Sequence, residues 1–149
     1  MDDADSNKRR LTRGEAVALL SRPLVGVFST VSVSGWIHSV PVHFLYTDDQ
    51  IRFLAGARDV KTRNAERTCQ GTLCVETTDG HTRSYVSVSG AASVLHPPEP
   101  GDLRALDRRY ARDDFASGWD EDSLASAVMI VVSIKRWIAW ADWDSVWRR

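Results

Sequence analysis

Six runs of residues with high β-propensity, joined by short turns, constrain the fold of this 149-residue chain more than any other feature. The expected strands cover residues 24–31, 36–46, 50–55, 72–77, 82–95 and 127–134. Turn residues such as Asp79-Gly80 separate successive runs, and connections this short join antiparallel strands. We therefore expect a mainly β fold with some α, built as a six-stranded antiparallel barrel with peripheral helices.

Three helices are expected around the strands. Thr12 and Glu15 form a capping box ahead of a short apolar stretch, which Pro23 ends. A second helix is expected over residues 59–68, and Asp102 is placed to cap a third. The apolar stripe of the third helix consists of Leu103, Leu106 and Tyr110.

Composition limits the class of protein. Residues 1–10 are charged or small and are expected to form a flexible tail, leaving residues 11–149 as a single domain. With 19 basic and 20 acidic residues the chain lacks the basic excess of a nucleic-acid-binding protein. No apolar run reaches the length of a membrane span, and no secretory signal is visible at the start. These features predict a cytoplasmic protein that binds neither nucleic acid nor membrane.

Neither the histidines nor the cysteines predict a metal site. His38 and His43 are an odd number of residues apart, so a regular strand would point them to opposite faces. Cys69 and Cys74 do not form a C-x-x-C motif, and we expect them to be reduced thiols. The sequence also lacks the phosphate-loop, dinucleotide-binding and zinc-protease motifs.

Cations gather where the helix over residues 59–68 is expected to start. They are Arg58, Lys61, Arg63 and Arg67. Each cation near a helix N-terminus costs roughly 0.3–1 kcal/mol, because that end already carries partial positive charge. An anion held at the helix end would offset this cost. A solvated basic face paired with acids such as Asp59 explains the spacing equally well, so both readings stay open.

Two further features admit a functional reading and a structural one. Pro41 interrupts the run at 36–46, which indicates an edge strand or a local break with free backbone groups that could meet a planar ligand. An irregular edge strand is the simpler explanation. The spacing of the last tryptophans is typical of helical or irregular packing, which favours a core or subunit interface over a ligand cage. They are Trp137, Trp140 and Trp143.

Taken in order, several motifs resemble the pyridoxamine 5'-phosphate oxidase-like split-barrel family, and within it the actinobacterial branch that uses the deazaflavin coenzyme F420. They are Gly35-x-x-His38-x-x-Pro41-Val42-x-Phe44, Lys61-Thr62-Arg63-Asn64, Tyr85-Val86-Ser87-Val88-x-Gly90 and Arg108-Arg109-Tyr110. The similarity extends over residues 11–143. It implies a six-stranded antiparallel split β-barrel that forms a homodimer, with two cofactor sites at the subunit interface.

The resemblance also implies roles for individual residues. Lys61, Thr62 and Arg63 belong to the phosphate-binding motif, and the anion reading of the helix start is therefore favoured. The segment His38, Ser39, Val40, Pro41, Val42 and His43 would run along the cofactor ring. Arg58 and Arg67 suit an anionic tail. No side chain is assigned as a proton donor.

The function expected from this resemblance is hydride transfer between reduced F420 and a small organic acceptor. Four cations suit F420, which is more anionic than FMN, and Ala55 replaces a hydroxyl residue common in FMN-using oxidases. Asp59, by contrast, places a negative charge beside the expected phosphate. The alternatives are an FMN-dependent oxidase or reductase of the same fold, and a non-catalytic protein that binds a flavin, a deazaflavin or haem.

Overall fold

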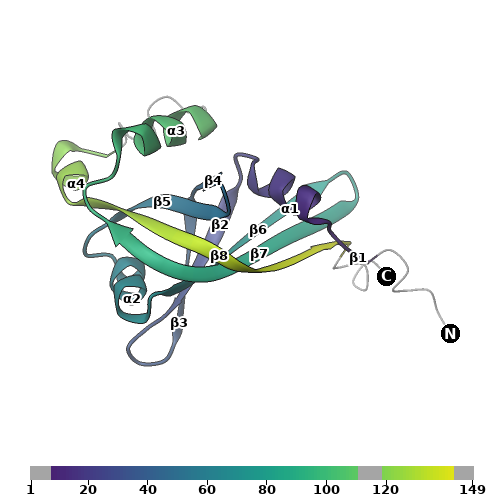
Figure 1. The fold of residues 1–149 in the computed structure, drawn as a ribbon, viewed down its shortest axis with the longest axis horizontal. Coiled ribbons are helices and arrows are strands. Elements are labelled where there is room, and N and C mark those ends of the chain that lie inside the picture. The colour runs from purple at the N-terminus through teal and green to yellow at the C-terminus, as the bar shows by residue number, and fades with distance from the viewer. Residues whose placement is uncertain (1–7, 111–118, 143–149) are drawn as a thin grey trace.

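The computed structural model describes residues 8–110 and 119–142, which form a curled antiparallel sheet with four helices (Figure 1). The strands are β1 (Arg9–Arg10), β2 (Val25–Val31), β3 (Ile37–His43), β4 (Leu45–Thr47), β5 (Gln50–Gly56), β6 (Gln70–Asp79), β7 (Thr82–Leu95) and β8 (Ala127–Ala141). The helices are α1 (Arg13–Leu20), α2 (Val60–Thr68), α3 (Pro100–Tyr110) and α4 (Glu121–Ala125). Strands pair in the order β3-β2-β6-β7-β8-β5-β4, and β1 pairs with β8.

The main core lies on the concave side of this sheet. Phe28 of β2 and Phe53 of β5 are fully buried, with ring centroids 4.7 Å apart in an edge-on arrangement. Val88 of β7 and Ile130 of β8 are buried in the same cluster. Burying each such side chain contributes roughly 1.5–3 kcal/mol, which favours the curled sheet over a flat one.

β8 explains the continuous apolar run that begins at Ala127. Its residues 127–132 are all buried, because each face of the strand packs against a different cluster. Val128, Ile130 and Val132 belong to the main core. Ala127, Met129 and Val131 pack instead with Leu106 of α3. Leu103 and Tyr110 join this second cluster, as the predicted stripe of the third helix requires.

The predicted start of the first helix is confirmed. Thr12 accepts a hydrogen bond from the Glu15 backbone at 3.1 Å, and the Glu15 carboxylate accepts one from the Thr12 backbone at 3.2 Å. Arg9 reaches the same carboxylate at 2.8 Å. Hydrogen bonds from Arg9 and from the Thr12 backbone lower the pKa of Glu15 to about 2.

The expected strand over residues 36–46 is divided at Phe44 into β3 and β4. The Tyr110 hydroxyl accepts a hydrogen bond from the Phe44 N–H at 2.8 Å and lies 2.9 Å from the Leu24 carbonyl oxygen. Arg109 donates to the Leu20 carbonyl at 2.6 Å and lies over the Phe44 ring. The end of α3 thus satisfies backbone groups that the break leaves outside the sheet.

The mainly β class with helices is confirmed, but the described residues form eight strands and not six. The division at Phe44 adds one strand, and β1 adds the other. Arg9 and Arg10, placed in the flexible tail by composition, pair with Ala141 and Trp140 of β8. α4 was not expected either, and α3 begins at Pro100, ahead of its predicted cap.

The last strand is longer than expected, and this changes the position of two tryptophans. β8 continues past residue 134 to Ala141, so Trp137 and Trp140 lie on a strand. Trp137 packs against the main core, as the packing interpretation predicts. Residues 1–7, 111–118 and 143–149, which include Trp143, lie outside the described residues. Among the described residues, no helix combines the length and apolarity needed to cross a membrane.

Candidate functional site

The loop between β5 and α2 is held in shape by two hydrogen bonds to Gly56. The Asp59 carboxylate accepts the Gly56 N–H at 2.9 Å, and the Thr62 hydroxyl donates to the Gly56 carbonyl at 2.7 Å. Asp59 is the N-cap residue of α2, but its side chain makes no capping bond to the helix. Thr62, a member of the predicted phosphate motif, is fully buried, and its hydrogen bond to Gly56 stabilises the loop.

Lys61 lies at the start of α2, with its side chain mostly buried. Its ammonium group is 2.7 Å from the Asp59 carboxylate, and 18% of the side chain is exposed. Burial alone would raise the pKa of Asp59, but hydrogen bonds from Lys61 and Gly56 outweigh it and lower that pKa below its ordinary value. An ammonium group has three N–H donors, so the bond to Asp59 leaves donors for a second anion.

The other predicted cations are distributed differently. Arg58 and Arg63 are exposed, and neither forms an ion pair among the described residues. Arg67 donates to the Val31 carbonyl oxygen and so ties α2 to β2. Only Lys61 is therefore paired as the solvated-face interpretation expects, and Arg58 and Arg63 keep their charge available.

A pocket of about 420 Å³ adjoins this loop, and of its lining residues the sequence drew attention only to Arg58 and Asp59. Arg58 and Asp59 line it from the loop. Trp119, Ser123 and Ser126 line it from the segment around α4. The capping of α4 by Asp120, which accepts the Ser123 N–H at 2.7 Å, was the one sequence signal for this element.

β3 is an edge strand, as Pro41 predicts. It pairs only with β2 among the described strands, without a register shift from His43 to Ile37. Half of the segment 38–43 therefore points to each face. His38, Val40 and Val42 alternate with Ser39, Pro41 and His43, so the two histidines lie on opposite faces as expected. One edge of the strand keeps backbone groups that no neighbouring strand uses.

Side chains on the two faces of β3 have different surroundings. Val42 is buried and Val40 packs against the core. Ser39 shares a hydrogen bond of 2.8 Å with Ser29, and the His43 ring lies edge-on to Tyr110 at 4.5 Å between centroids. The buried Nδ1 of His38 has no hydrogen-bond partner among the described residues. An unsatisfied buried nitrogen on this strand is compatible with a ligand partner.

Both cysteines are free thiols in the described chain. Cys69 is exposed and caps the C-terminus of α2, whereas Cys74 is half-buried on β6. Burial, with a smaller contribution from Glu76, raises the pKa of Cys74 above its ordinary value. Within residues 8–110 and 119–142, no three His, Cys, Asp or Glu side chains gather in a group that could hold a metal ion.

The curled antiparallel sheet matches the split-barrel fold of several solved structures. An F420 reductase is 23% identical, with a TM-score of 0.70 over 85% of this chain and 98% of the other. An FAD-binding protein from Mesorhizobium loti is 19% identical, with a TM-score of 0.70 over 90% and 97%. A conserved hypothetical protein from Mycobacterium tuberculosis is 20% identical, with a TM-score of 0.71 over 87% and 84%.

A family model described as pyridoxamine 5'-phosphate oxidase matches residues 12–141. The chain therefore belongs to the pyridoxamine 5'-phosphate oxidase family of flavin-binding oxidoreductases. No curated protein matches the chain.

Proposed function

We propose that this protein is an oxidoreductase that transfers a hydride between reduced coenzyme F420 and a small organic acceptor. The observation that carries the proposal is the charge at the start of α2. Residues 58–63 contain three cations and one carboxylate, and among the described residues Lys61 alone of the three forms an ion pair, whereas Arg67 lies in the last turn of the helix. An anionic ligand would remove the conflict between these cations and the helix N-terminus.

The residues present fit an anionic cofactor. Lys61 has free donors and Arg63 is exposed two residues further along, and we propose that the two would hold the phosphate. Arg58 borders the adjoining pocket and would face an anionic tail, whereas Arg67, in the last turn of α2, donates to the Val31 carbonyl oxygen. Asp59 opposes this attraction, but it accepts hydrogen bonds from Lys61 and Gly56, which partly neutralise its negative charge.

The free edge of β3, from Ser39 to His43, would lie along the ring system. Backbone groups there can orient a planar ligand, and the buried face behind Val40 and Val42 excludes water from one side. Hydride transfer is chemistry that the coenzyme supplies when bound, and the protein contributes position and charge. His38 carries the one unsatisfied buried nitrogen of the described part of this strand.

Two other functions remain as candidates. FMN-dependent oxidation or reduction is favoured by the family match and by the similarity in fold to an FAD-binding protein. F420 is favoured by the number of cations, by Ala55 in place of a hydroxyl residue and by the similarity in fold to an F420 reductase. A protein that binds either cofactor without turnover is the third candidate.

Fluorescence titration of the purified chain against F420 and FMN separately tests the choice of cofactor. We expect saturable binding of F420 that is at least tenfold tighter than that of FMN, which corresponds to about 1.4 kcal/mol. Oxidation of reduced F420 by conjugated acceptors, followed by absorbance, then separates an enzyme from a carrier. Tighter binding of FMN contradicts the F420 assignment, and binding without turnover favours the carrier.

We also propose a homodimer, because the face formed by β2 and β3 is apolar and exposed. At the hairpin Val33 is 85% exposed, Trp36 79% and Ile37 71%. Val27 and Val31 of β2 continue the same face. Exposed apolar surface of this kind is typical of an interface. Sedimentation equilibrium at micromolar concentration is expected to give twice the 16.6 kDa chain mass, and a monomer would contradict the dimer.

A further inference from the structure

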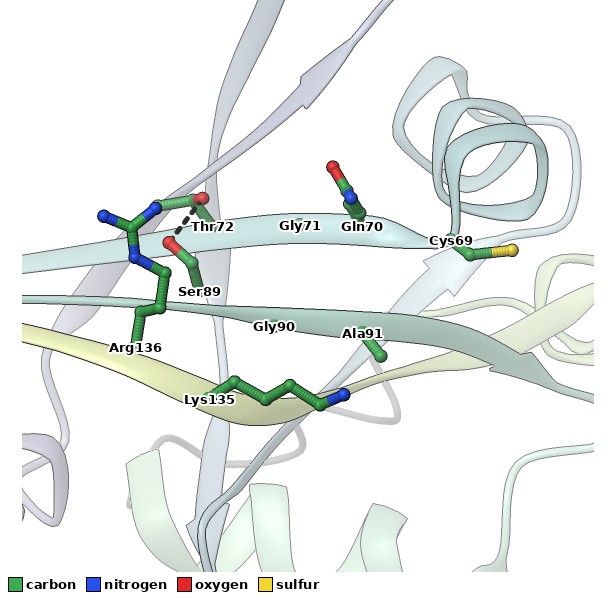
Figure 2. Close-up of a pocket in the computed structure, with 9 residues that line it drawn as sticks. All are labelled: Cys69, Gln70, Gly71, Thr72, Ser89, Gly90, Ala91, Lys135 and Arg136. Carbon is green, nitrogen blue, oxygen red and sulfur yellow. Dashed lines mark hydrogen bonds between the residues drawn. The ribbon is translucent and has the colours of Figure 1, made fainter.

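A second pocket, of about 420 Å³, opens over β6, β7 and β8 (Figure 2). It shares none of its lining with the pocket beside Arg58, and it lies at the other end of α2, where Cys69 caps the helix. Its polar side chains are Gln70, Thr72, Ser89, Lys135 and Arg136. The proposed cofactor site uses none of these residues.

A β-bulge explains why two neighbouring cations face one pocket. Ser89 pairs with Arg136 but Gly90 pairs with Ile134, so Lys135 is an extra residue on β8. On a regular strand, consecutive side chains point to opposite faces. The bulge changes this alternation, and Lys135 and Arg136 both line the pocket.

The pocket is positively charged without compensation. No carboxylate lines it, and neither Lys135 nor Arg136 forms an ion pair within the described parts of the chain. Thr72 and Ser89 contribute two hydroxyl groups 2.8 Å apart. Figure 2 shows the Arg136 guanidinium beside these hydroxyls and the Lys135 side chain extending toward Ala91. The two charges therefore lie toward different ends of the pocket.

We infer that this pocket binds a small molecule that carries two separated anionic groups. Arg136, with its planar set of donors and the adjacent hydroxyls of Thr72 and Ser89, takes one group. Lys135 takes the other as a point charge. A dicarboxylate and a diphosphate both have this chemistry, and the pocket volume accommodates either one. The inference does not depend on which cofactor the protein uses.

Isothermal titration calorimetry of the full chain with succinate and with pyrophosphate, in separate experiments, tests the site. We expect one saturable site for at least one probe, with an affinity that falls as salt rises. Arg136→Gln should weaken binding by about tenfold or more, the effect of losing one charge-assisted hydrogen-bonding group. Lys135→Gln should weaken it several-fold. The probe that binds with higher affinity shows whether the natural ligand is a carboxylate or a phosphate compound.

Arg108→Gln is the matched control, because it removes one positive charge from an exposed position on α3. It should leave the affinity within twofold of the parent, and circular dichroism should show all variants folded. The inference is overturned if neither probe saturates below about 10 mM. It is also overturned if Arg136→Gln has no more effect than Arg108→Gln, or if Lys61→Gln abolishes binding while Arg136→Gln does not.

Discussion

Replacing Gly90 by alanine is expected to leave little folded protein. A Cβ atom at residue 90 would lie 1.7 Å from the Ser133 carbonyl oxygen, well inside any contact that real atoms make. That oxygen belongs to the strand opposite, next to the bulge, so relief requires β7 and β8 to separate locally. These two strands form the longest pairing in the sheet. We expect a loss of at least about 4 kcal/mol in the free energy of unfolding.

Gly101→Ala provides the control for this prediction. Gly101 lies in the first turn of α3, and nothing lies within 4 Å of the position that its Cβ would occupy. Alanine there should leave the free energy of unfolding unchanged or raise it by up to about 1 kcal/mol. Urea denaturation followed by circular dichroism measures both variants. A Gly90→Ala protein with the midpoint of the parent would show that the bulge relaxes without cost.

Elements governed by local signals could be predicted from the sequence. The Thr12 and Glu15 capping box gives the start of α1, and Pro41 gives the edge position of β3. In both cases the physical cause lies within a few residues: two reciprocal hydrogen bonds in one, a missing N–H in the other. The helix over residues 59–68 and the turn at Asp79-Gly80 belong to the same class.

Elements that depend on distant partners could not be predicted. No turn residue adjoins Phe44 in the sequence, and the break there is stabilised by the Tyr110 hydroxyl, 66 residues away. β1 exists because Arg9 and Arg10 meet the end of β8. Their charged side chains give no strand signal. These two contacts account for the difference between six expected strands and eight observed.

The candidate site shows the same division. Sequence reasoning gathered the cations around Lys61 from spacing alone, whereas the burial of Thr62 and its hydrogen bond to Gly56 are evident only from the fold. It also predicted that His38 and His43 lie on opposite faces of their strand, which the register of β3 confirms. Lys135 and Arg136 gave no signal, because only the register of β7 against β8 shows that they share a pocket.

Removing the charge of Lys61 should cause the largest loss of cofactor affinity. Lys61→Ala deletes the one mostly buried ammonium group at the start of α2 and leaves the Asp59 carboxylate uncompensated beside the expected phosphate. A charge-assisted hydrogen bond contributes roughly 1.5–3 kcal/mol, so we expect affinity to fall by about 10- to 100-fold. Arg63→Ala, at an exposed position, should reduce it by only a few-fold. Fluorescence titration at two salt concentrations measures both effects.

Replacing Asp59 tests whether a change in cofactor affinity comes from charge at the site or from a general loss of structure. The pKa of this carboxyl is below its ordinary value, so it stays ionised at neutral pH and repels an anionic cofactor. Asp59→Asn keeps an oxygen that can accept the Gly56 N–H and should tighten cofactor binding several-fold, the opposite of Lys61→Ala. Because the folded-state pKa of Asp59 is lowered, its contribution to stability is present above its unfolded pKa and is lost as pH falls through the folded value.

Arg104→Ala, which removes an exposed charge on α3, is the control for these affinity measurements and should leave cofactor affinity within twofold. If both Lys61→Ala and Arg63→Ala also stay within twofold of the parent, these residues lie outside the cofactor site.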